Sequence, residues 1–271
     1  MRGGKIGIFD SGLGGLLILR SLVKKLPAYD YIYLGDTKRV PYGNRSHDVI
    51  YQFLEEGVDF LLREGCELVI VACNTASATA LRKIQRGYLS KHPNKKVLGV
   101  IIPAAEASKG AKKVGVLGTE ATVRSKAFVR ELKKIGKDIE VYQQAAPLLV
   151  PLIEQGKARE SLVFLGEYLA PLLEKGVDTI ILGCTHYGLL REEIRGIAGP
   201  EITIISEDEI LADKLSAYLA RHPKIEEKIS RRKERRLLVT ALNPYYKEVA
   251  GRWFGEKTGL QVADLKPIPP R

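Results

Sequence analysis

The 271-residue chain has few of the residues and patterns that define several protein classes. Three cysteines are too few for a disulfide framework, so we expect a reduced, cytoplasmic protein. No uncharged apolar run approaches the roughly 18 residues that a membrane span needs. The first residues contain no apolar segment followed by a cleavage site, so no secretory signal is expected. A content of 45% hydrophobic and 28% charged residues excludes disordered and low-complexity classes.

The charge is unbalanced, because 43 Lys and Arg stand against 32 Asp and Glu and give a net charge of +11. Residues 221–236 contain eight Lys/Arg and three Glu, and the remaining excess is scattered. No zinc-finger, RNP or helix-turn-helix pattern accompanies this charge, and 6 Phe and 1 Trp offer few surfaces for base stacking. We therefore expect a solvated basic segment and neither nucleic acid nor membrane as a partner. Nucleic-acid binding by residues 228–236 is the alternative.

Short apolar runs alternate with stretches of helical period, which is typical of parallel sheets covered on both faces. Strands are expected at residues 5–9, 31–34, 68–72, 97–102, 114–117, 139–143, 179–182, 202–205, 237–240 and 260–262. Helices are expected at residues 13–25, 47–63, 75–86, 121–134, 158–175 and 207–221. The carboxyl ends of such strands are where α/β proteins bind ligands, so the residues after each strand deserve the closest reading.

Two segments of the sequence resemble two segments further along the chain. KIGIFDSG at 5–12 is similar to KVGVLGTE at 113–120, and LVIVACNT at 68–75 is similar to TIILGCT at 179–185. Buried strands look alike because they share Val and Ile, but that does not explain the cysteine and threonine after each. We predict an α/β fold of two similar domains with mainly parallel sheets flanked by helices, and an active site in the cleft between them.

Residues after 213 contain a helix, a basic linker, a strand, a helix and a strand, which is too little core for a separate domain. We expect this segment to pack on the first half. The predicted domains are therefore a discontinuous N-terminal domain of residues 1–101 plus 213–271, and a second domain of residues 102–212.

Two cysteines stand in matching positions, each after a strand and before a polar segment. Cys73 precedes Asn74 and Thr75, and Cys184 precedes Thr185 and His186. A helix N-terminus there would favour a thiolate, whereas a single cysteine after a strand is more often a core residue. Two cysteines in matching positions favour a catalytic role for both. Zinc-ligand spacings are missing, so no metal is expected, and His186 suits a proton partner.

Other polar residues have both a structural and a chemical interpretation. Cys66 has no polar residue after it and is assigned to packing. Asp10 opens the glycine-rich DSGLGG turn, which matches no phosphate-binding pattern and could hold a smaller anion such as a carboxylate. Asp10 could equally be only a helix N-cap, and Asp36 only a turn residue. Glu154 is the one acid of an apolar segment and could be an exposed carboxylate at a helix end.

Two thiols on opposite sides of a ligand suit stereoinversion, because one removes a proton from a carbon and the other delivers one to the opposite face. Nucleophilic catalysis needs only one thiol, and a redox pair needs sulfurs close enough to bond. A proton next to a carboxylate is far less acidic than a thiol, so the thiolates would need desolvation and oriented partners.

Six segments in order, DSGLGG, YLGDTKRVPYG, VACNTAS, LGTEATV, VPLIEQG and GCTHYGLL, closely resemble the glutamate racemase family, and RWFG at 252–255 matches more loosely. The resemblance implies cofactor-independent interconversion of L- and D-glutamate, supply of D-glutamate to peptidoglycan, and a homodimer. It implies that Cys73 deprotonates D-glutamate with help from Asp10, and that Cys184 deprotonates L-glutamate with help from His186 and Glu154.

The same resemblance implies that the substrate contacts a set of loop residues: Asp10, Ser11, Pro41, Tyr42, Gly43, Asn74, Thr75, Thr119, Thr185 and His186. No lysine stands in a pyridoxal-phosphate motif, which agrees with an enzyme that needs no cofactor. Two alternatives stay open: a racemase of the same superfamily that acts on aspartate or a related acid, and a non-catalytic amino-acid-binding protein on the same scaffold.

Overall fold

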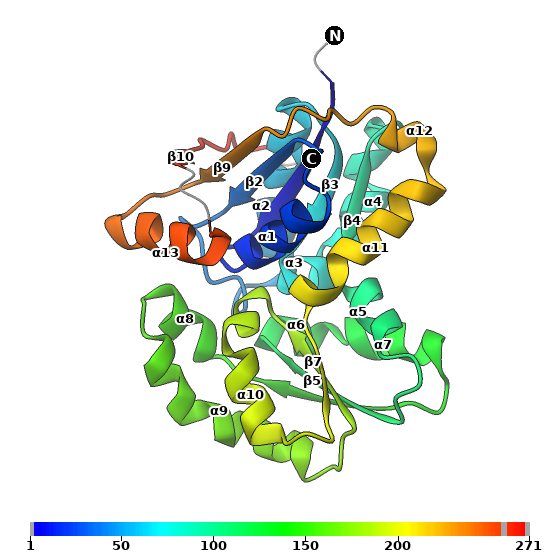
Figure 1. Ribbon diagram of the computed structural model, residues 1–271, viewed down its shortest axis with the longest axis vertical. Coiled ribbons are helices and arrows are strands. Elements are labelled where there is room, and N and C mark those ends of the chain that lie inside the picture. The colour runs from blue at the N-terminus through cyan, green and yellow to red at the C-terminus, as the bar shows by residue number, and fades with distance from the viewer. Residues whose placement is uncertain (1–2, 256–258, 269–271) are drawn as a thin grey trace.

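A computed structural model describes residues 3–255 and 259–268, which form two parallel sheets with helices on both faces (Figure 1). The first sheet has the order β10-β9-β2-β1-β3-β4. Its strands are β1 (Lys5–Asp10), β2 (Tyr31–Gly35), β3 (Cys66–Val71), β4 (Lys96–Gly99), β9 (Arg235–Val239) and β10 (Leu260–Val262). The second sheet has the order β6-β5-β7-β8. Its strands are β5 (Lys113–Gly118), β6 (Glu140–Ala145), β7 (Thr179–Gly183) and β8 (Thr203–Ile205).

We call each sheet, with the helices packed on it, a lobe. The helices of the first lobe are α1 (Gly15–Lys25), α2 (His47–Arg63), α3 (Asn74–Thr79), α4 (Leu81–Arg86), η1 (Tyr88–Lys91), α11 (Glu207–Arg221), α12 (Pro223–Glu226) and α13 (Pro244–Phe254). Those of the second lobe are α5 (Ile101–Ala107), α6 (Glu120–Ser125), α7 (Ala127–Ile135), α8 (Leu149–Glu154), α9 (Ala158–Leu173), η2 (Thr185–Leu190) and α10 (Arg191–Ala198). None of the described helices is long and apolar enough to cross a membrane.

The central strand of the first sheet is apolar on both faces, as a strand covered by helices on both sides must be. Side chains alternate along a strand, so Ile6 and Ile8 pack in one core together with the apolar face of α1. Phe9 points to the opposite core, which includes Leu54 and Val58 of α2. The expected α/β class with mainly parallel sheets is confirmed.

The two lobes share a strand order, which confirms the internal resemblance. In the first sheet β1 lies between β2 and β3, with β4 next, and in the second sheet β5 lies between β6 and β7, with β8 next. The cysteine-bearing strand ends of β3 and β7 therefore occupy equivalent places beside the central strands.

The C-terminal segment returns to the first lobe. Helix α11 leaves β8 and packs on α1, and β9 then pairs with β2 so that Tyr33 lies opposite Leu237. Strands β9 and β10 thus extend the edge of the first sheet. The exact domain boundaries at 101/102 and 212/213 stay a prediction. Residues 1–2, 256–258 and 269–271 of those ranges lie outside the described part of the chain.

Three expected elements differ from the structure. The expected strand 97–102 ends at Gly99, and α5 begins at Ile101, because an apolar run alone does not distinguish a buried strand from a buried helix. The expected helix 75–86 is divided at Ala80 into α3 and α4. The expected helix 121–134 is divided at Lys126, whose φ of 53° is left-handed. Helices α8 and α10 were not anticipated from periodicity, since both are short.

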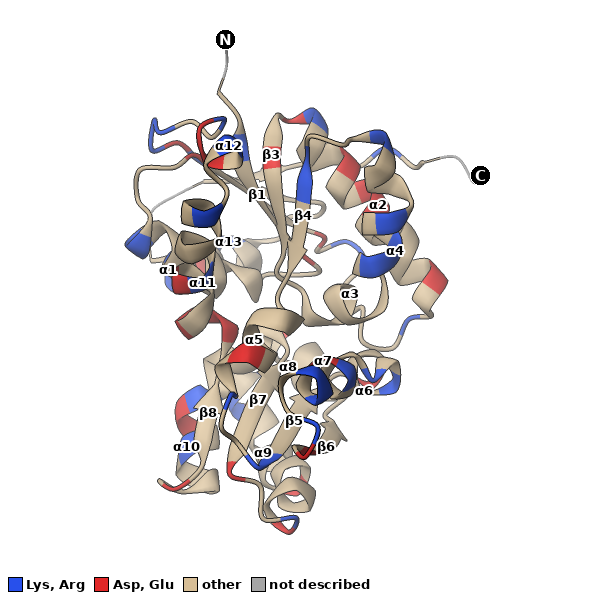
Figure 2. Ribbon diagram, turned by 90° about the vertical axis from the view of Figure 1, so that its right-hand side faces the viewer, with Lys and Arg blue, Asp and Glu red and all other residues tan. Residues whose placement is uncertain are grey.

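Charges of both signs are spread over the helices and loops of both lobes (Figure 2). Within the basic segment, Arg231 forms an ion pair with Glu226, and Arg236 lies 2.5 Å from Glu64. Arg235 donates a 2.6 Å hydrogen bond to the carbonyl oxygen of Pro27. These cations hold parts of the chain to one another, in agreement with a structural interpretation of the segment.

Candidate active site

The carboxyl edges of the two sheets face each other, and the loops after their strands are in contact. Thr185, after β7, donates a 3.3 Å hydrogen bond to Asp10 at the end of β1. Thr75, in α3, and Thr119, after β5, share a 2.8 Å hydrogen bond between their hydroxyls. The fold thus brings together residues that are up to 175 positions apart in the sequence.

The DSGLGG turn has glycines where the other lobe comes close. A side chain at Gly12 would come within 2.2 Å of Oε1 of Glu154, and one at Gly14 within 2.6 Å of Oγ1 of Thr185. Within the turn, the N–H of Leu13 donates a 3.1 Å hydrogen bond to Oε1 of Glu154. The tight turn therefore allows a close junction between the lobes.

Asp10 is fully buried and has partners in both lobes. Its Oδ2 accepts hydrogen bonds from the N–H groups of Gly12 at 3.2 Å and Gly15 at 3.1 Å. Burial raises the pKa of Asp10, whereas the His186 charge and the two backbone N–H groups lower it. Asp10 is therefore not the N-cap of α1, which is Gly14, but it accepts a hydrogen bond from the first residue of the helix and also reaches the second lobe.

Cys73 lies at the N-cap of α3 and is 4% exposed. Its sulfur accepts a 3.5 Å hydrogen bond from the N–H of Ala76, and its thiol donates a 3.3 Å hydrogen bond to Oγ of Ser11. Burial raises the pKa of Cys73 to about 12, and the Asp10 and Cys184 charges raise it as well, whereas the hydrogen bonds with Ser11 and Ala76 act to lower it. Cys73 is therefore a thiol at neutral pH, close enough to Asp10 and Cys184 for their charges to act on it.

Cys184 has a chain of two partners behind it. Its sulfur lies 3.8 Å from Nδ1 of His186, and Nε2 of His186 lies 2.5 Å from Oε1 of Glu154. Burial alone would lower the pKa of His186, but the hydrogen bonds to Cys184 and Glu154 bring it well above the usual imidazole value. Glu154 is 9% exposed, so the interpretation as a solvent-exposed helix-end carboxylate is wrong. The three side chains form a relay from carboxylate through imidazole to sulfur.

The other predicted residues lie around these two cysteines or in the loop that reaches the second lobe. The carbonyl oxygen of Gly43 accepts a 2.9 Å hydrogen bond from the N–H of Ala121, and Pro41 precedes Tyr42 in that same loop. The Tyr42 hydroxyl donates a hydrogen bond to Asp36, so Asp36 supports the loop as a buried acceptor. Cys66 is fully buried in the core of the first lobe, in agreement with packing.

Sequence reasoning missed several residues at this junction. Tyr33 donates a 2.7 Å hydrogen bond to the carbonyl oxygen of Gly12, and Trp253 of α13 presents an edge-on ring to His186 with 6.3 Å between centroids. Glu207 is a buried acid at the start of α11. Only Glu207 had a local signal, namely an acidic residue two positions after the end of an apolar strand. In the described ranges 3–255 and 259–268, no group of three His, Cys, Asp or Glu side chains is arranged to hold a metal.

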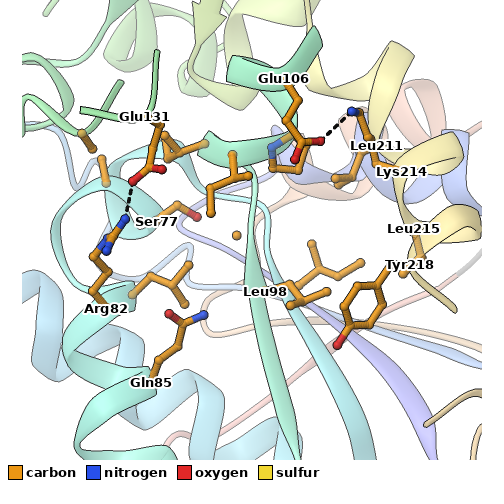
Figure 3. A pocket seen from close by; sticks show the side chains of 18 of the residues that line it. Ser77, Arg82, Gln85, Leu98, Glu106, Glu131, Leu211, Lys214, Leu215 and Tyr218 are labelled. Atoms are coloured by element: carbon orange, nitrogen blue, oxygen red, sulfur yellow. Dashed lines mark hydrogen bonds and ion pairs between the residues drawn. The ribbon is translucent and has the colours of Figure 1, made fainter. Parts of the chain in front are cut away.

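A separate cavity of about 420 Å³ lies among α4, α5, α7 and α11 and is lined by none of the predicted site residues (Figure 3). Arg82 of α4 pairs with Glu131 of α7 at one side of it. Lys214 of α11 lies 2.7 Å from Glu106 of α5 at another side. The two ion pairs bind helices of different lobes to each other, away from the cysteines.

Comparison with known proteins agrees with this fold. The sequence profile of the Asp/Glu/hydantoin racemase family matches residues 12–214, so the chain belongs to this family. The glutamate racemase of Geobacter metallireducens is 39% identical, over 94% of either chain, and that of Oceanobacillus iheyensis is 43% identical, over 80% of either chain. Within the family, the chain is an isomerase of the glutamate racemase group.

Solved structures support the same grouping. A glutamate racemase from Bacillus anthracis superposes with a TM-score of 0.88 at 31% identity, covering 99% of this chain and 100% of that one. A glutamate racemase from Francisella tularensis, in complex with D-glutamate, has a TM-score of 0.87 at 30% identity, covering 98% of this chain and 99% of that one. The two-lobed architecture is therefore that of the glutamate racemases.

Proposed function

We propose that this protein interconverts L- and D-glutamate without a cofactor, using Cys73 and Cys184 as two acid/base groups. One observation carries the proposal: two buried cysteines, one from each lobe, lie at facing strand ends, Cys73 near the Asp10 charge and Cys184 beside His186. The similarity to a glutamate racemase solved with D-glutamate supports glutamate as the substrate.

The proposed reaction is balanced in protons. In the direction from L to D, the Cys184 thiolate removes the α-proton of L-glutamate, and the Cys73 thiol delivers its proton to the opposite face of the carbanion. The C–H bond on one face breaks, one forms on the other, and the two sulfurs exchange roles. The raised pKa of Cys73 supports this direction, because Cys73 is then the protonated donor that the step requires.

Each sulfur has a partner for the return of its proton. The relay from Glu154 through His186 lies behind Cys184, and a buried His186 with a raised pKa carries a proton that it can exchange with that sulfur. Asp10 is close enough to Cys73 to raise its pKa and has one oxygen bonded to Thr185. We propose that Asp10 assists Cys73 and that His186 and Glu154 assist Cys184.

The polar loop residues would hold the substrate. Both polar atoms of the Asn74 side chain lack a hydrogen-bond partner among the described residues, although Asn74 is 1% exposed. Buried amides are nearly always hydrogen-bonded, so a carboxylate of the substrate is a suitable partner for the Nδ2 donor. We propose substrate contacts from this amide and from the surrounding loop residues: Asp10, Ser11, Pro41, Tyr42, Gly43, Thr75, Thr119, Thr185 and His186.

The wider role follows from the family. We propose that the D-glutamate formed is used in peptidoglycan synthesis, and that the enzyme acts as a homodimer in the cytoplasm. Size-exclusion chromatography with light scattering tests the dimer, and loss of cell shape that added D-glutamate restores tests the pathway.

The central experiment is proton NMR of L-glutamate in D2O with purified protein and no added cofactor. The α-proton signal should disappear while the optical activity of the solution falls to zero. A loss of optical activity that requires an added cofactor would contradict the proposal. Aspartate at the same concentration is the matched control, and faster exchange of aspartate than of glutamate would favour the alternative substrate.

A further inference from the structure

Two buried acids lie behind the loop between β2 and α2, residues 36–45, which carries three of the proposed substrate contacts. Asp36 opens the loop and is fully buried, and Glu56 of α2 is 3% exposed. Removing two carboxylates from water is costly unless each is paired with a cation or with hydrogen-bond donors. Their burial beside a proposed binding loop therefore requires an explanation.

Arg39, within this loop, joins the two acids. Its Nε lies 2.6 Å from Oδ2 of Asp36, and its Nη1 donates a hydrogen bond to Oε2 of Glu56. Among the ion pairs of the described residues, no other cation reaches either carboxylate. The guanidinium also lies 4.0 Å from the centre of the Phe53 ring on α2, which is a cation–π contact. Arg39 therefore holds the loop against α2.

The Asp36 carboxylate also holds a residue that is proposed to contact the substrate. Its Oδ2 accepts a hydrogen bond from the Tyr42 hydroxyl, and its Oδ1 accepts a 2.8 Å hydrogen bond from Thr240. The N–H of Asp36 donates a 2.9 Å hydrogen bond to the carbonyl oxygen of Asp10. Tyr42 therefore has its hydroxyl partner in Asp36, and Asp36 has its counter-charge in Arg39.

The next part of the loop meets the second lobe. The carbonyl oxygen of Gly43 accepts a 2.9 Å hydrogen bond from the N–H of Ala121 in α6. A side chain at Gly43 would come within 2.8 Å of Cβ of Thr119. Gly43 and Thr119 are both proposed substrate contacts, so a shift of the loop would change the space between two residues that bind the substrate.

We propose that Arg39 is a positioning residue that holds residues 41–43 against the substrate by pairing with both buried acids. This inference rests on the proposed function. A planar guanidinium can donate to two carboxylates at once, whereas a lysine ammonium is a single point charge on a flexible stem. Without the guanidinium, one of the two acids would have to take up a proton or draw water to its buried position, and either change would shift the loop.

The test is the steady-state kinetics of Arg39→Lys with each enantiomer of glutamate. The lysine keeps the charge but cannot bridge both acids, so KM should rise about tenfold. The value of kcat should change less, because Arg39 acts on residues that bind the substrate and not on the acid/base groups. A wild-type KM in Arg39→Lys would overturn the inference.

The matched control is Arg236→Lys, which makes the same change near the C-terminal end of α2. Arg236 of β9 lies 2.5 Å from Glu64, the C-cap residue of α2. This variant should keep the wild-type KM and kcat. Glu56→Gln weakens the bridge from the α2 side with little change in shape and should also raise KM. An unchanged KM in Glu56→Gln would count against the inference even if Arg39→Lys does not fold.

A double-mutant cycle tests the route from Arg39 to the substrate. In a Tyr42→Phe background, Arg39→Lys should raise KM by a smaller factor than in the wild type, because part of its effect passes through the Tyr42 hydroxyl. Equal factors in the two backgrounds would contradict the proposed chain of contacts from Arg39 through Asp36 to Tyr42.

Amide hydrogen exchange of the substrate-free protein gives a readout that does not depend on turnover. In Arg39→Lys the amide of Ala121, which donates to Gly43, should exchange about tenfold faster than in the wild type, while the amides of β5 keep their rates. An unchanged Ala121 rate, or equal acceleration at Ala121 and in β5, would overturn the inference. Wild-type protein that exchanges no α-proton of glutamate would contradict the proposed function instead, and a faster Ala121 amide in Arg39→Lys would still show that Arg39 holds the loop.

Discussion

The two cysteines differ in which group near them carries a proton at neutral pH. The Cys73 thiol is protonated at neutral pH because it is buried beside an acid, whereas His186 behind Cys184 keeps a proton because Glu154 and the sulfur both attract it. The two sides of the site are therefore not mirror images, although the strands that carry them are equivalent. Catalysis in both directions requires that the substrate-bound site reduce this difference.

Replacing either thiol should stop racemisation without unfolding the protein. In Cys73→Ser and Cys184→Ser we expect kcat to fall by at least about 100-fold in both directions, because a serine hydroxyl is a much weaker acid and a positioned acid/base group contributes that much or more. The measurement is circular dichroism of either enantiomer, with the unfolding curve of each variant as a check on folding. Cys66→Ser is the control outside the site. Full turnover by either site variant would refute the two-base mechanism.

The supporting residues should act unequally on the two directions. The enantiomers have equal free energy, so kcat/KM must fall by the same factor in both directions for any variant. Asp10→Asn and His186→Asn should each lower it by about 10- to 100-fold. The asymmetry should appear in kcat and in the primary deuterium isotope effect, larger from D-glutamate for Asp10→Asn and from L-glutamate for His186→Asn. Identical changes from both enantiomers would contradict the assigned sides.

At the scale of elements, several helices that look continuous in the sequence are divided in the structure. Lys126 has a φ of 53° between α6 and α7, a conformation that costs a residue with a side chain more than it costs glycine. At the other end of α6, Thr119 and Thr122 contact Thr75 of α3. The chain therefore contains a strained residue where the second lobe meets α3.

Lys126→Gly should relieve that strain. Since Lys126 is exposed, we expect the free energy of unfolding to rise by about 0.5–1 kcal/mol. The control is Lys133→Gly, in the exposed face of α7, which should lower it by about 1 kcal/mol. Urea unfolding of both variants measures the difference, and a loss of stability in Lys126→Gly would show that the lysine side chain has another role.

At the scale of the whole molecule, the two lobes contact each other through the loops around the cysteines and again beside the cavity among α4, α5, α7 and α11. Glu131 has its pKa lowered there: burial acts to raise it, but the hydrogen bonds from Lys134 and Arg82 outweigh burial. A carboxylate whose pKa is below 4.5 in the folded state stabilises the fold above pH 4.5. This contribution is lost as the pH falls through the folded-state pKa.

Glu131→Gln should therefore destabilise the protein at neutral pH and not in acid. We expect the free energy of unfolding to fall by no more than about 1 kcal/mol at pH 7, because solvent screens a partly exposed pair. The difference from the wild type should shrink as the pH falls below 4.5. Glu167→Gln, on an exposed position of α9, is the control. A difference that stays constant with pH would assign the effect to packing and not to charge.

The chain's local patterns determined much of this protein. Alternating apolar runs gave the two parallel sheets, and matching contexts singled out Cys73 and Cys184, because strand periodicity and residue order are local properties. Division of the helices at Ala80 and Lys126 was not visible, since neither residue is a Gly or Pro that would mark a helix end in the sequence.

Only the tertiary structure showed where the acids lie relative to the partners of the two cysteines. Glu154 looked like a possible surface carboxylate until α8 placed it 2.5 Å from His186, 32 residues further along the chain. The start of α11 lies against η2, the segment after Cys184, because α11 crosses from the second sheet to the first. Helices and strands follow from the backbone preferences of each segment. Contacts between distant residues, in contrast, form only when the two lobes pack against each other.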